Sequence, residues 1–423
     1  MQKFIIILII FFTSSIFAET LNLENCINLA LEKNSEITIL KNNYEISKSK
    51  IKESKSNYFP RIIGNFSILK QETFFETLDE SSVVNSSMDK TNCNISFSLK
   101  QNIWDFGKTF SVVNQALLNE NLSLLQLEKK KESIYFEVKK CYFILLQAKA
   151  INQIANTNLK SLENLLNSIK AKKEQGLATS LDVLQLELEY TKLKAEINKT
   201  NYQIELAKMS LSNFINKNDF EIEEKKIILD ELEFKNFEEC KEKALLNRIE
   251  FKKLILQENI YKTKIVSIRS EYFPNIGGSF SYGFQNNKFD FPFKKNWSCG
   301  LNISIPLFDG FFTREKLFSA KQELKNVVSE KEQLIQNISL QIKKNYYKVL
   351  EEKGNFEVVQ KKLEYSNANL ESIKAKYKEE LATFTELIDG QTKKINCDIE
   401  YQQFFYSYQI ALNELYQSIG VIK

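Results

Sequence analysis

The chain has 423 residues, of which 43% are hydrophobic and 12% aromatic, and its formal net charge is +4. Acidic and basic residues alternate along it, which excludes the concentrated basic surface of a nucleic-acid-binding protein. The sequence contains no histidine, so the usual zinc sites and any His-dependent catalytic triad are absent. Its six cysteines are widely spaced and form no C-x-x-C pair. We therefore expect no metal and no other cofactor.

The first 18 residues have the layout of a secretory signal. A short apolar segment, residues 4–17, follows Lys3, and small residues precede a cleavage site after Ala18. The segment is shorter than the ~20 residues that a membrane-spanning helix needs. We therefore expect residues 1–18 to be removed and the mature chain to begin at Glu19. No later segment is apolar enough for a membrane helix, so membrane insertion would require strands.

The most informative feature is an internal repeat. Residues Tyr58-Phe59-Pro60 recur as Tyr272-Phe273-Pro274, and Leu177-Ala178-Thr179 recur as Leu381-Ala382-Thr383. The repeat predicts two units, 19–218 and 219–423, each with the order helix, strand, loop, strand, long helix, tip, helix. The matching residues are 214 positions apart at the first motif and 204 at the second. The spacing differs because the second unit is shorter between its strands, where the first has a polar segment at 71–92. We predict that this segment is a loop outside the cell.

The predicted strands show alternating polarity. Ile95, Phe97 and Leu99 would face one side, and Ser96 and Ser98 the other. The other three strands have a similar pattern, with Ile62, Phe66 and Ile68, then Ile276, Phe280, Tyr282 and Phe284, then Trp297, Leu301, Ile303, Ile305 and Leu307 on the apolar side.

At about ten residues each, these strands match the length of membrane-spanning β-strands. A half-buried sheet in a soluble domain has the same alternation. However, four such strands in a chain with a secretory signal and no other evident core favour the membrane. Because four strands cannot close a barrel, other subunits would have to complete the sheet.

Few glycines and prolines, 11 and 4 in the whole chain, interrupt the remaining segments, which predicts long helices. We expect long helices near 108–175 and in the matching part of the second unit, packed against shorter helices near 22–57 and 180–216. Apolar residues three and four apart form a seam along the first long helix, with one polar interruption at Asn152. The seam contains Val138, Cys141, Leu145, Ala148, Asn152, Ala155, Leu159, Leu162, Leu166 and Ile169.

This layout resembles the TolC family of outer-membrane factors over the whole mature chain. The supporting motifs are the paired Tyr-Phe-Pro strand entries, Asp105-Phe106-Gly107 at a strand exit, and the segment from Gly176 to Leu184, which is similar to the family's helix-turn-helix tip. The second tip has Glu380 where glycine is usual.

The resemblance implies a mainly α fold with a membrane β-barrel portion. Long antiparallel coiled-coil helices would form a periplasmic tunnel, and four strands from each chain of a homotrimer would complete a 12-stranded barrel. It also implies four kinds of partner, namely outer-membrane lipid, a periplasmic adaptor (membrane fusion) protein, an inner-membrane RND or ABC transporter, and further copies of the chain, with no nucleic acid. The chain would then be the outer-membrane exit duct of a tripartite efflux or type I secretion system. The alternatives are a periplasmic coiled-coil scaffold or adhesin stalk without a pore and, with less support, an enzyme.

The resemblance also assigns roles at the tips. Asp182, Glu386 and Asp389 match acids at the family's periplasmic gate, and Tyr377 matches a tyrosine that links neighbouring helices. Three copies of these acids would form a ring that favours cations. The alternative is an ordinary solvated helix face, on which Lys393 pairs with Asp389. The resemblance assigns the tip turns and adaptor docking to Gly176, Leu177, Ala178, Thr179, Leu381, Ala382 and Thr383.

Cys26 and Cys240 occupy equivalent positions of the two repeats, and secreted proteins often contain disulfides. In a cylinder of helices spaced ~10 Å apart, equivalent positions two helices apart would be ~20 Å from each other. A disulfide needs Cα atoms within ~7 Å. We therefore expect these two cysteines not to bond to each other.

Overall fold

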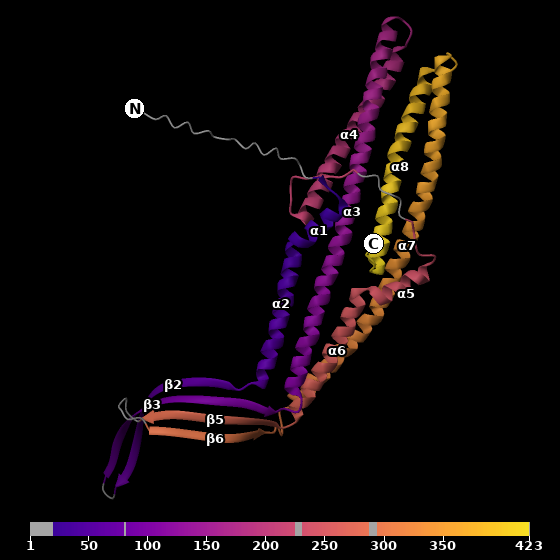
Figure 1. Cartoon of the computed structure of the whole chain (residues 1–423). Coiled ribbons are helices and arrows are strands. Elements are labelled where there is room, and N and C mark those ends of the chain that lie inside the picture. The colour runs from indigo at the N-terminus through magenta and orange to yellow at the C-terminus, as the bar shows by residue number, and fades with distance from the viewer. Residues whose placement is uncertain (1–19, 80–81, 225–230, 287–293, 423) are drawn as a thin grey trace, which may run out of the picture. The chain divides into compact units, whose positions relative to one another are not determined.

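The computed structural model describes residues 20–79, 82–224, 231–286 and 294–422 (Figure 1). The predicted signal lies outside the described residues. In this part of the chain, no helix combines the length and apolar character needed to cross a membrane.

The chain divides into two compact units, and each takes segments from both halves of the sequence. One, which we name the sheet unit, comprises Leu40–Leu127 and Ile249–Ile335. The other, which we name the hairpin unit, comprises Met1–Ile39, Glu128–Arg248 and Gln336–Lys423.

The element order of the first half recurs in the second. Corresponding helices have identical lengths of 11, 21, 67 and 36 residues in the two halves. The repeat boundaries 19–218 and 219–423 remain a prediction. The elements are β1 (Thr20–Leu21), α1 (Leu23–Lys33), α2 (Ser35–Lys55), η1 (Ser56–Tyr58), β2 (Arg61–Asp79), β3 (Ser82–Trp104), α3 (Lys108–Glu174), α4 (Ser180–Ile215), β4 (Glu221–Ile222), α5 (Phe237–Asn247), α6 (Ile249–Arg269), η2 (Ser270–Tyr272), β5 (Asn275–Asn286), β6 (Lys294–Ser304), α7 (Phe312–Lys378) and α8 (Phe384–Ile419).

The helix predicted near 22–57 is interrupted, which corrects that prediction. Asn34 is extended, with φ −67° and ψ 125°, and separates α1 from α2. Its side-chain oxygen accepts hydrogen bonds from the backbone N–H groups of Glu36 and Ile37, at 2.9 and 3.3 Å. These bonds satisfy donors that the start of α2 would otherwise leave free. Arg248 adopts the same conformation between α5 and α6, with φ −61° and ψ 124°.

The sheet unit contains one antiparallel sheet in the order β2-β3-β5-β6 (Figure 1). Its register confirms the predicted separation of polarity. Ile62, Leu99 and Phe280 align across three strands on one face, which we name the apolar face. On the other face, which we name the polar face, Ser98 aligns with Ser281, which in turn aligns with Ser298. Large side chains of the apolar face are exposed in the single chain, for example Trp297 at 71% and Leu301 at 75%.

The first strand pair is longer than predicted. We expected about ten residues per strand and a loop over 71–92, but β2 and β3 have 19 and 23 residues and pair continuously from Arg61↔Lys100 to Asp79↔Ser82. The predicted loop is thus an extension of the hairpin. Polar residues dominate the segment, which obscured its extended backbone, because paired backbone groups stabilise a hairpin whatever the polarity of its side chains.

Two helical hairpins, α3–α4 and α7–α8, have their tips in the hairpin unit, while α3 and α7 begin in the sheet unit (Figure 1). The observed α3 and α4 follow the predicted boundaries 108–175 and 180–216 closely. Most apolar residues of the predicted α3 seam are buried, including Val138, Leu145 and Ala155, each 0% exposed. Asn152 is accommodated by hydrogen bonds from its amide to the side chains of Thr200 and Asn201, at 2.8 and 2.9 Å. The hydrogen bonds of Asn152 therefore help to fix the position of α3 along α4.

All six cysteines are free thiols in the structure. Cys26 and Cys240 are buried on α1 and α5, where burial raises the pKa of each thiol to about 11. Both therefore remain protonated at neutral pH and pack as small apolar side chains.

Candidate functional site

The two helical hairpins turn with the same backbone geometry at their tips. At the end of α3, Gly176 has φ +77°, and the N–H of Leu177 donates to the carbonyl of Lys172 at 2.8 Å. At the end of α7, Glu380 has φ +62°, and the N–H of Leu381 donates to the carbonyl of Lys376 at 2.8 Å. Each turn satisfies carbonyls that the helix end would otherwise leave free. Glu380 thus adopts the left-handed conformation that glycine adopts in the first tip.

Asp182 and Glu386 each complete a capping box at the start of the following helix. The carboxylate of Asp182 accepts from the N–H of Thr179 at 2.8 Å, and the hydroxyl of Thr179 accepts from the N–H of Asp182 at 3.1 Å. The equivalent bonds join Glu386 to Thr383 at 2.7 and 3.2 Å. Hydrogen bonds from the N–H and then the hydroxyl of Thr383 lower the pKa of Glu386. Both acids therefore stabilise a helix start.

The remaining predicted tip residues differ in exposure. Leu177 and Leu381 are 72% and 78% exposed at the two turns, although leucine side chains usually pack inside. Asp389 is exposed on α8, one turn after Glu386, and no ion pair joins it to Lys393 in the part of the chain that the structure describes. The structure therefore places the predicted residues at two corresponding tips, where the leucines of both turns are exposed to solvent.

Tyr377 contacts both hairpins. Its ring centroid lies 6.2 Å from that of Phe384 at the start of α8, and the ammonium of Lys172 from α3 lies 5.6 Å from the ring centroid. This cation–π contact ties the first tip to the second within one chain. Sequence reasoning did not identify Lys172, because nothing distinguishes it from the neighbouring lysines before the spatial contact is known.

The two hairpins also share a core, which holds the tips together. Leu186 of α4 and Ile388 of α8, at 0% and 1% exposure, belong to one buried cluster that also includes Leu162 and Ile169 of α3 and Leu370 of α7. The two tips can therefore act as one body.

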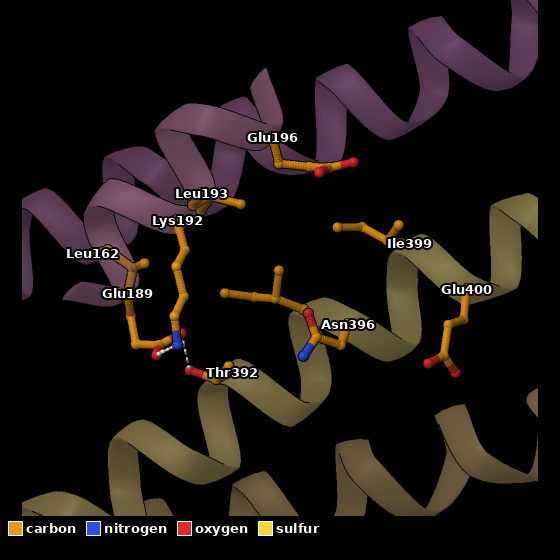
Figure 2. A pocket seen from close by; sticks show the side chains of 10 residues that line it. Leu162, Glu189, Lys192, Leu193, Glu196, Thr392, Asn396, Ile399 and Glu400 are labelled. Atoms are coloured by element: carbon orange, nitrogen blue, oxygen red, sulfur yellow. Dashed lines mark hydrogen bonds and ion pairs between the residues drawn. The ribbon is translucent and has the colours of Figure 1, made fainter. Parts of the chain in front are cut away.

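Beside this core, a cavity of about 410 Å³ lies between α4 and α8 (Figure 2). Figure 2 shows Lys192 extending toward Glu189, and the two are joined by an ion pair of 2.7 Å. Glu196 and Glu400 contribute further acids to the lining, and Glu400 is paired with Lys362 of α7 at 2.6 Å. This cavity was not predicted, because in the sequence its acidic residues look like those of any solvated helix surface. In the described residues, no group of three or more possible ligands is placed to bind a metal ion.

Comparisons with known proteins agree with this architecture. The sequence pattern of the family described as "Outer membrane efflux protein" matches residues 26–217 and 241–421. No curated protein matches the chain as a relative.

Among solved structures, the chain is similar to a membrane protein from Pseudomonas aeruginosa, with 18% identity, a TM-score of 0.81 and coverage of 94% of this chain and 93% of the other. It is also similar to the Campylobacter jejuni CmeC outer membrane channel, with 14% identity, a TM-score of 0.80 and coverage of 94% and 85%. The Neisseria gonorrhoeae MtrE outer membrane channel in its open state has 18% identity, a TM-score of 0.79 and coverage of 94% and 89%. These TM-scores and coverages establish a shared fold, and the family match covers most of the sequence. The chain therefore belongs to the outer membrane efflux protein family.

Proposed function

We propose that this protein is the outer-membrane exit duct of a tripartite efflux or type I secretion system, through which small molecules or proteins pass without chemical change. The observation that carries the proposal is the sheet with one exposed apolar face and one polar face. Such a sheet fits between lipid on one side and water on the other. The helical hairpins of the same chain would extend the aqueous path through the periplasm.

A single chain cannot form this duct, so the proposal includes a homotrimer with a 12-stranded barrel. In the part of the sheet that the structure describes, β2 and β6 are each paired along one edge only. Lipid provides no hydrogen-bonding partner for a free strand edge, so neighbouring copies would pair these edges.

The helices also present apolar surface suited to other copies of the chain or to a partner protein. Exposed apolar side chains lie on the side of α4 and α7 away from the buried positions, in two groups on α4 and at intervals of about one or two turns on α7. They are Leu181, Leu184, Leu188, Tyr202, Leu206 and Met209 on α4, and Leu340, Tyr347, Leu350, Val358 and Tyr365 on α7.

The tips would form the periplasmic entrance and its gate. Asp182, Glu386 and Asp389 would line the aperture as carboxylates, and Tyr377 would hold neighbouring tips together. The exposed turns of both tips, from Gly176 to Thr179 and from Leu381 to Thr383, would dock a periplasmic adaptor protein. The adaptor would connect the duct to an inner-membrane RND or ABC transporter, whose energy drives export.

The proposal assigns no catalysis to the chain, since passive conduction needs only a lumen and a gate. The competing function is a coiled-coil scaffold or adhesin stalk without a pore. The apolar face of the sheet argues against a stalk, because exposed apolar surface of this kind has no role in water.

Reconstitution of the purified full-length protein distinguishes the two functions. We expect particles with the mass of three chains in detergent, and discrete conductance steps in planar bilayers. A stalk would leave the bilayer sealed. Stable trimers that never conduct, from preparations in which a known porin does conduct, would refute the duct.

A further inference from the structure

The polar face of the sheet contains a basic hollow where the strands meet the helices. A cavity of about 690 Å³ lies there, within the sheet unit. Three basic residues line it, Arg61 of β2, Lys100 of β3 and Lys108 of α3, against a single acid, Asp105. The neutral lining is mostly small or carries amide groups, and includes Asn57, Asn102, Asn275, Gly277, Ser279 and Asn302.

Arg61 and Lys100 are opposite each other across the pair of strands β2 and β3. Side chains at directly opposed positions share one face, and like charges placed there destabilise a sheet. The guanidinium of Arg61 donates to the side-chain oxygen of Asn57 at 3.3 Å, and neither base makes an ion pair within the described residues. The sheet therefore retains an unfavourable charge pair that no ion pair of the described residues relieves.

The one acidic residue that lines the hollow, Asp105, already accepts hydrogen bonds from neighbouring groups. A single carboxylate oxygen of Asp105 accepts from the amide of Asn102 at 2.9 Å, from the N–H of Thr109 at 2.9 Å and from the hydroxyl of Thr109. This carboxylate caps α3. Lys108, the third base, forms an ion pair with Glu271 at 3.2 Å. The charges of Arg61 and Lys100 are the ones that remain available to a ligand.

Small residues keep the space beside these two bases open. Across the sheet, the row of Arg61 and Lys100 continues with Ser279 on β5 and Gly300 on β6. A Cβ atom added at Gly300 would meet nothing within 4 Å, and one at Gly277 would meet only a backbone oxygen at 3.6 Å. A ligand of several atoms can therefore reach both bases from the polar side.

Solubility of the polar face does not require these charges. The next row contains Ile63, Ser98, Ser281 and Ser298, and the three serine hydroxyls hydrate the face without charge. Lys294, at the far end of β6, is the other basic residue of this face where the structure describes its side chains. The placement of Arg61 and Lys100 side by side at one end of the polar face therefore indicates a bound ligand.

We infer that Arg61 and Lys100 form a binding site for multivalent oxyanions, that is, for phosphate or for molecules with several carboxylates. Arginine binds such groups through two parallel N–H bonds, lysine adds a point charge, and the surrounding amides can donate further hydrogen bonds. The inference rests on the proposed duct for its role: in a trimer, three such sites would surround the lumen and favour anionic cargo. Their sign is opposite to that of the acids at the periplasmic tips.

Equilibrium binding tests the site without depending on conduction. Isothermal titration of the full-length protein in detergent should show inorganic phosphate and succinate binding to the parent. The double variant R61Q/K100Q should bind each at least about fivefold more weakly, because both charges are lost. The exchanged variant R61K/K100R keeps both charges and should stay close to the parent. Binding of phosphate alone would identify an inorganic ion as the ligand, and binding of both would extend it to carboxylated cargo.

Lys294→Gln is the matched control, since it removes a base from the same face outside the hollow and should change binding less than about twofold. Equal affinity of the parent and R61Q/K100Q would overturn the inference, as would an equal loss with Lys294→Gln. If the double variant fails to assemble, Arg61→Gln and Lys100→Gln are titrated singly, and parental affinity in both would also refute the site. In planar bilayers, phosphate should block the parent at lower concentration than R61Q/K100Q. Phosphate binding by a protein that never conducts would refute the duct and leave the site intact.

Discussion

Gly176 and Glu380, at equivalent positions of the two tips, differ in how easily their residue types adopt the backbone conformation found there. Gly176 and Glu380 both have positive φ, and both are followed by a leucine whose N–H closes the turn. Side chains with a Cβ cost roughly 1–2 kcal/mol in this region, whereas glycine adopts it freely. The second tip therefore contains local strain that the first lacks.

Replacing Glu380 with glycine should relieve that strain and stabilise the second tip by about 1 kcal/mol. Hydrogen exchange of the Leu381 amide, measured by mass spectrometry on the intact protein, should slow about fivefold. Gly176→Ala is the reciprocal change and should speed exchange at Leu177. Faster exchange in Glu380→Gly would mean that the side chain of Glu380 stabilises the turn and outweighs the strain.

The acids at the tips have two separable roles, one as caps and one as charges. Glu386→Gln together with Asp182→Asn removes charge, and glutamine in particular can still accept the hydrogen bond from the helix start. Thr179→Ala with Thr383→Ala removes the reciprocal bonds and keeps both carboxylates. We predict that the first pair reduces block by multivalent cations and raises conductance, while the second mainly loosens the tips.

Conductance steps and hydrogen exchange measured on all variants separate these outcomes. Asp182→Ala with Glu386→Ala removes both roles and should leave a trimer that conducts more and is blocked less. If the charge-removing pair conducts and is blocked like the parent, these acids act only as caps. Their gate role is then wrong.

The cap of α8 also has a pH dependence of known sign. The pKa of Glu386 is lowered in the folded protein, so its contribution is complete above the ordinary glutamate value of about 4.3 and is lost as the pH falls through the folded value. Exchange of the Thr383 amide, which donates to the Glu386 carboxylate, should therefore accelerate, beyond the intrinsic effect of pH, only below about pH 4. Glu386→Gln should show no such additional change, because the glutamine cannot titrate.

At the level of elements, the sequence predicts those helices and strands whose residues follow a regular polar and apolar pattern. The 67-residue helices α3 and α7 were expected because few glycines and prolines interrupt these segments, and the boundaries predicted for the first, 108–175, fall within a few residues of the observed ones. The break at Asn34 was missed because asparagine also occurs inside helices, and its two capping bonds become evident only in the structure. The extension of β2 and β3 was missed because its pairing depends on backbone bonds that side-chain polarity does not report.

Helix α8 is also tied to both long helices by one carboxylate, which no sequence pattern indicated. Glu414 accepts from Lys140 of α3 at 2.9 Å and from Lys348 of α7 at 2.8 Å. Although burial raises the pKa of Glu414, the hydrogen bonds from Lys140 and Lys348 together lower it. The three residues therefore form a charged clamp across three helices.

We predict that Glu414→Gln destabilises the hairpin unit by about 1–2 kcal/mol at neutral pH, after allowance for partial exposure to solvent. Because the folded pKa lies below the ordinary value, this contribution is present above pH ~4.3 and is lost as the pH falls further. Denaturant midpoints of parent and variant should therefore differ at pH 7 and converge near pH 3. Glu364→Gln breaks an exposed ion pair with Lys361 and should leave the midpoint unchanged. A parent–variant difference that persists at pH 3 would mean that packing, and not charge, links the helices at Glu414.

For the whole molecule, the alternation of the strands is the property on which membrane insertion depends. The sequence predicted both faces of the sheet, because a period of two is independent of tertiary context. It did not predict the groove between α4 and α8 or the contact between Lys172 and Tyr377, because both join residues that are far apart in the sequence. The orientation of the sheet relative to lipid can be tested with two nearby positions on one strand.

Leu301 and Ser298 lie on opposite faces of β6, three residues apart near the middle of the strand. An arginine on a lipid-facing side costs about 2–4 kcal/mol at the bilayer midplane, and in a trimer this cost would arise three times. Leu301→Arg should therefore reduce the amount of assembled protein in outer-membrane fractions severely. Ser298→Arg would place the same side chain in the aqueous lumen and should assemble normally, with an altered conductance. If Ser298→Arg abolished assembly and Leu301→Arg did not, the polar face would be the one in contact with lipid, and the duct as proposed would have its sheet reversed.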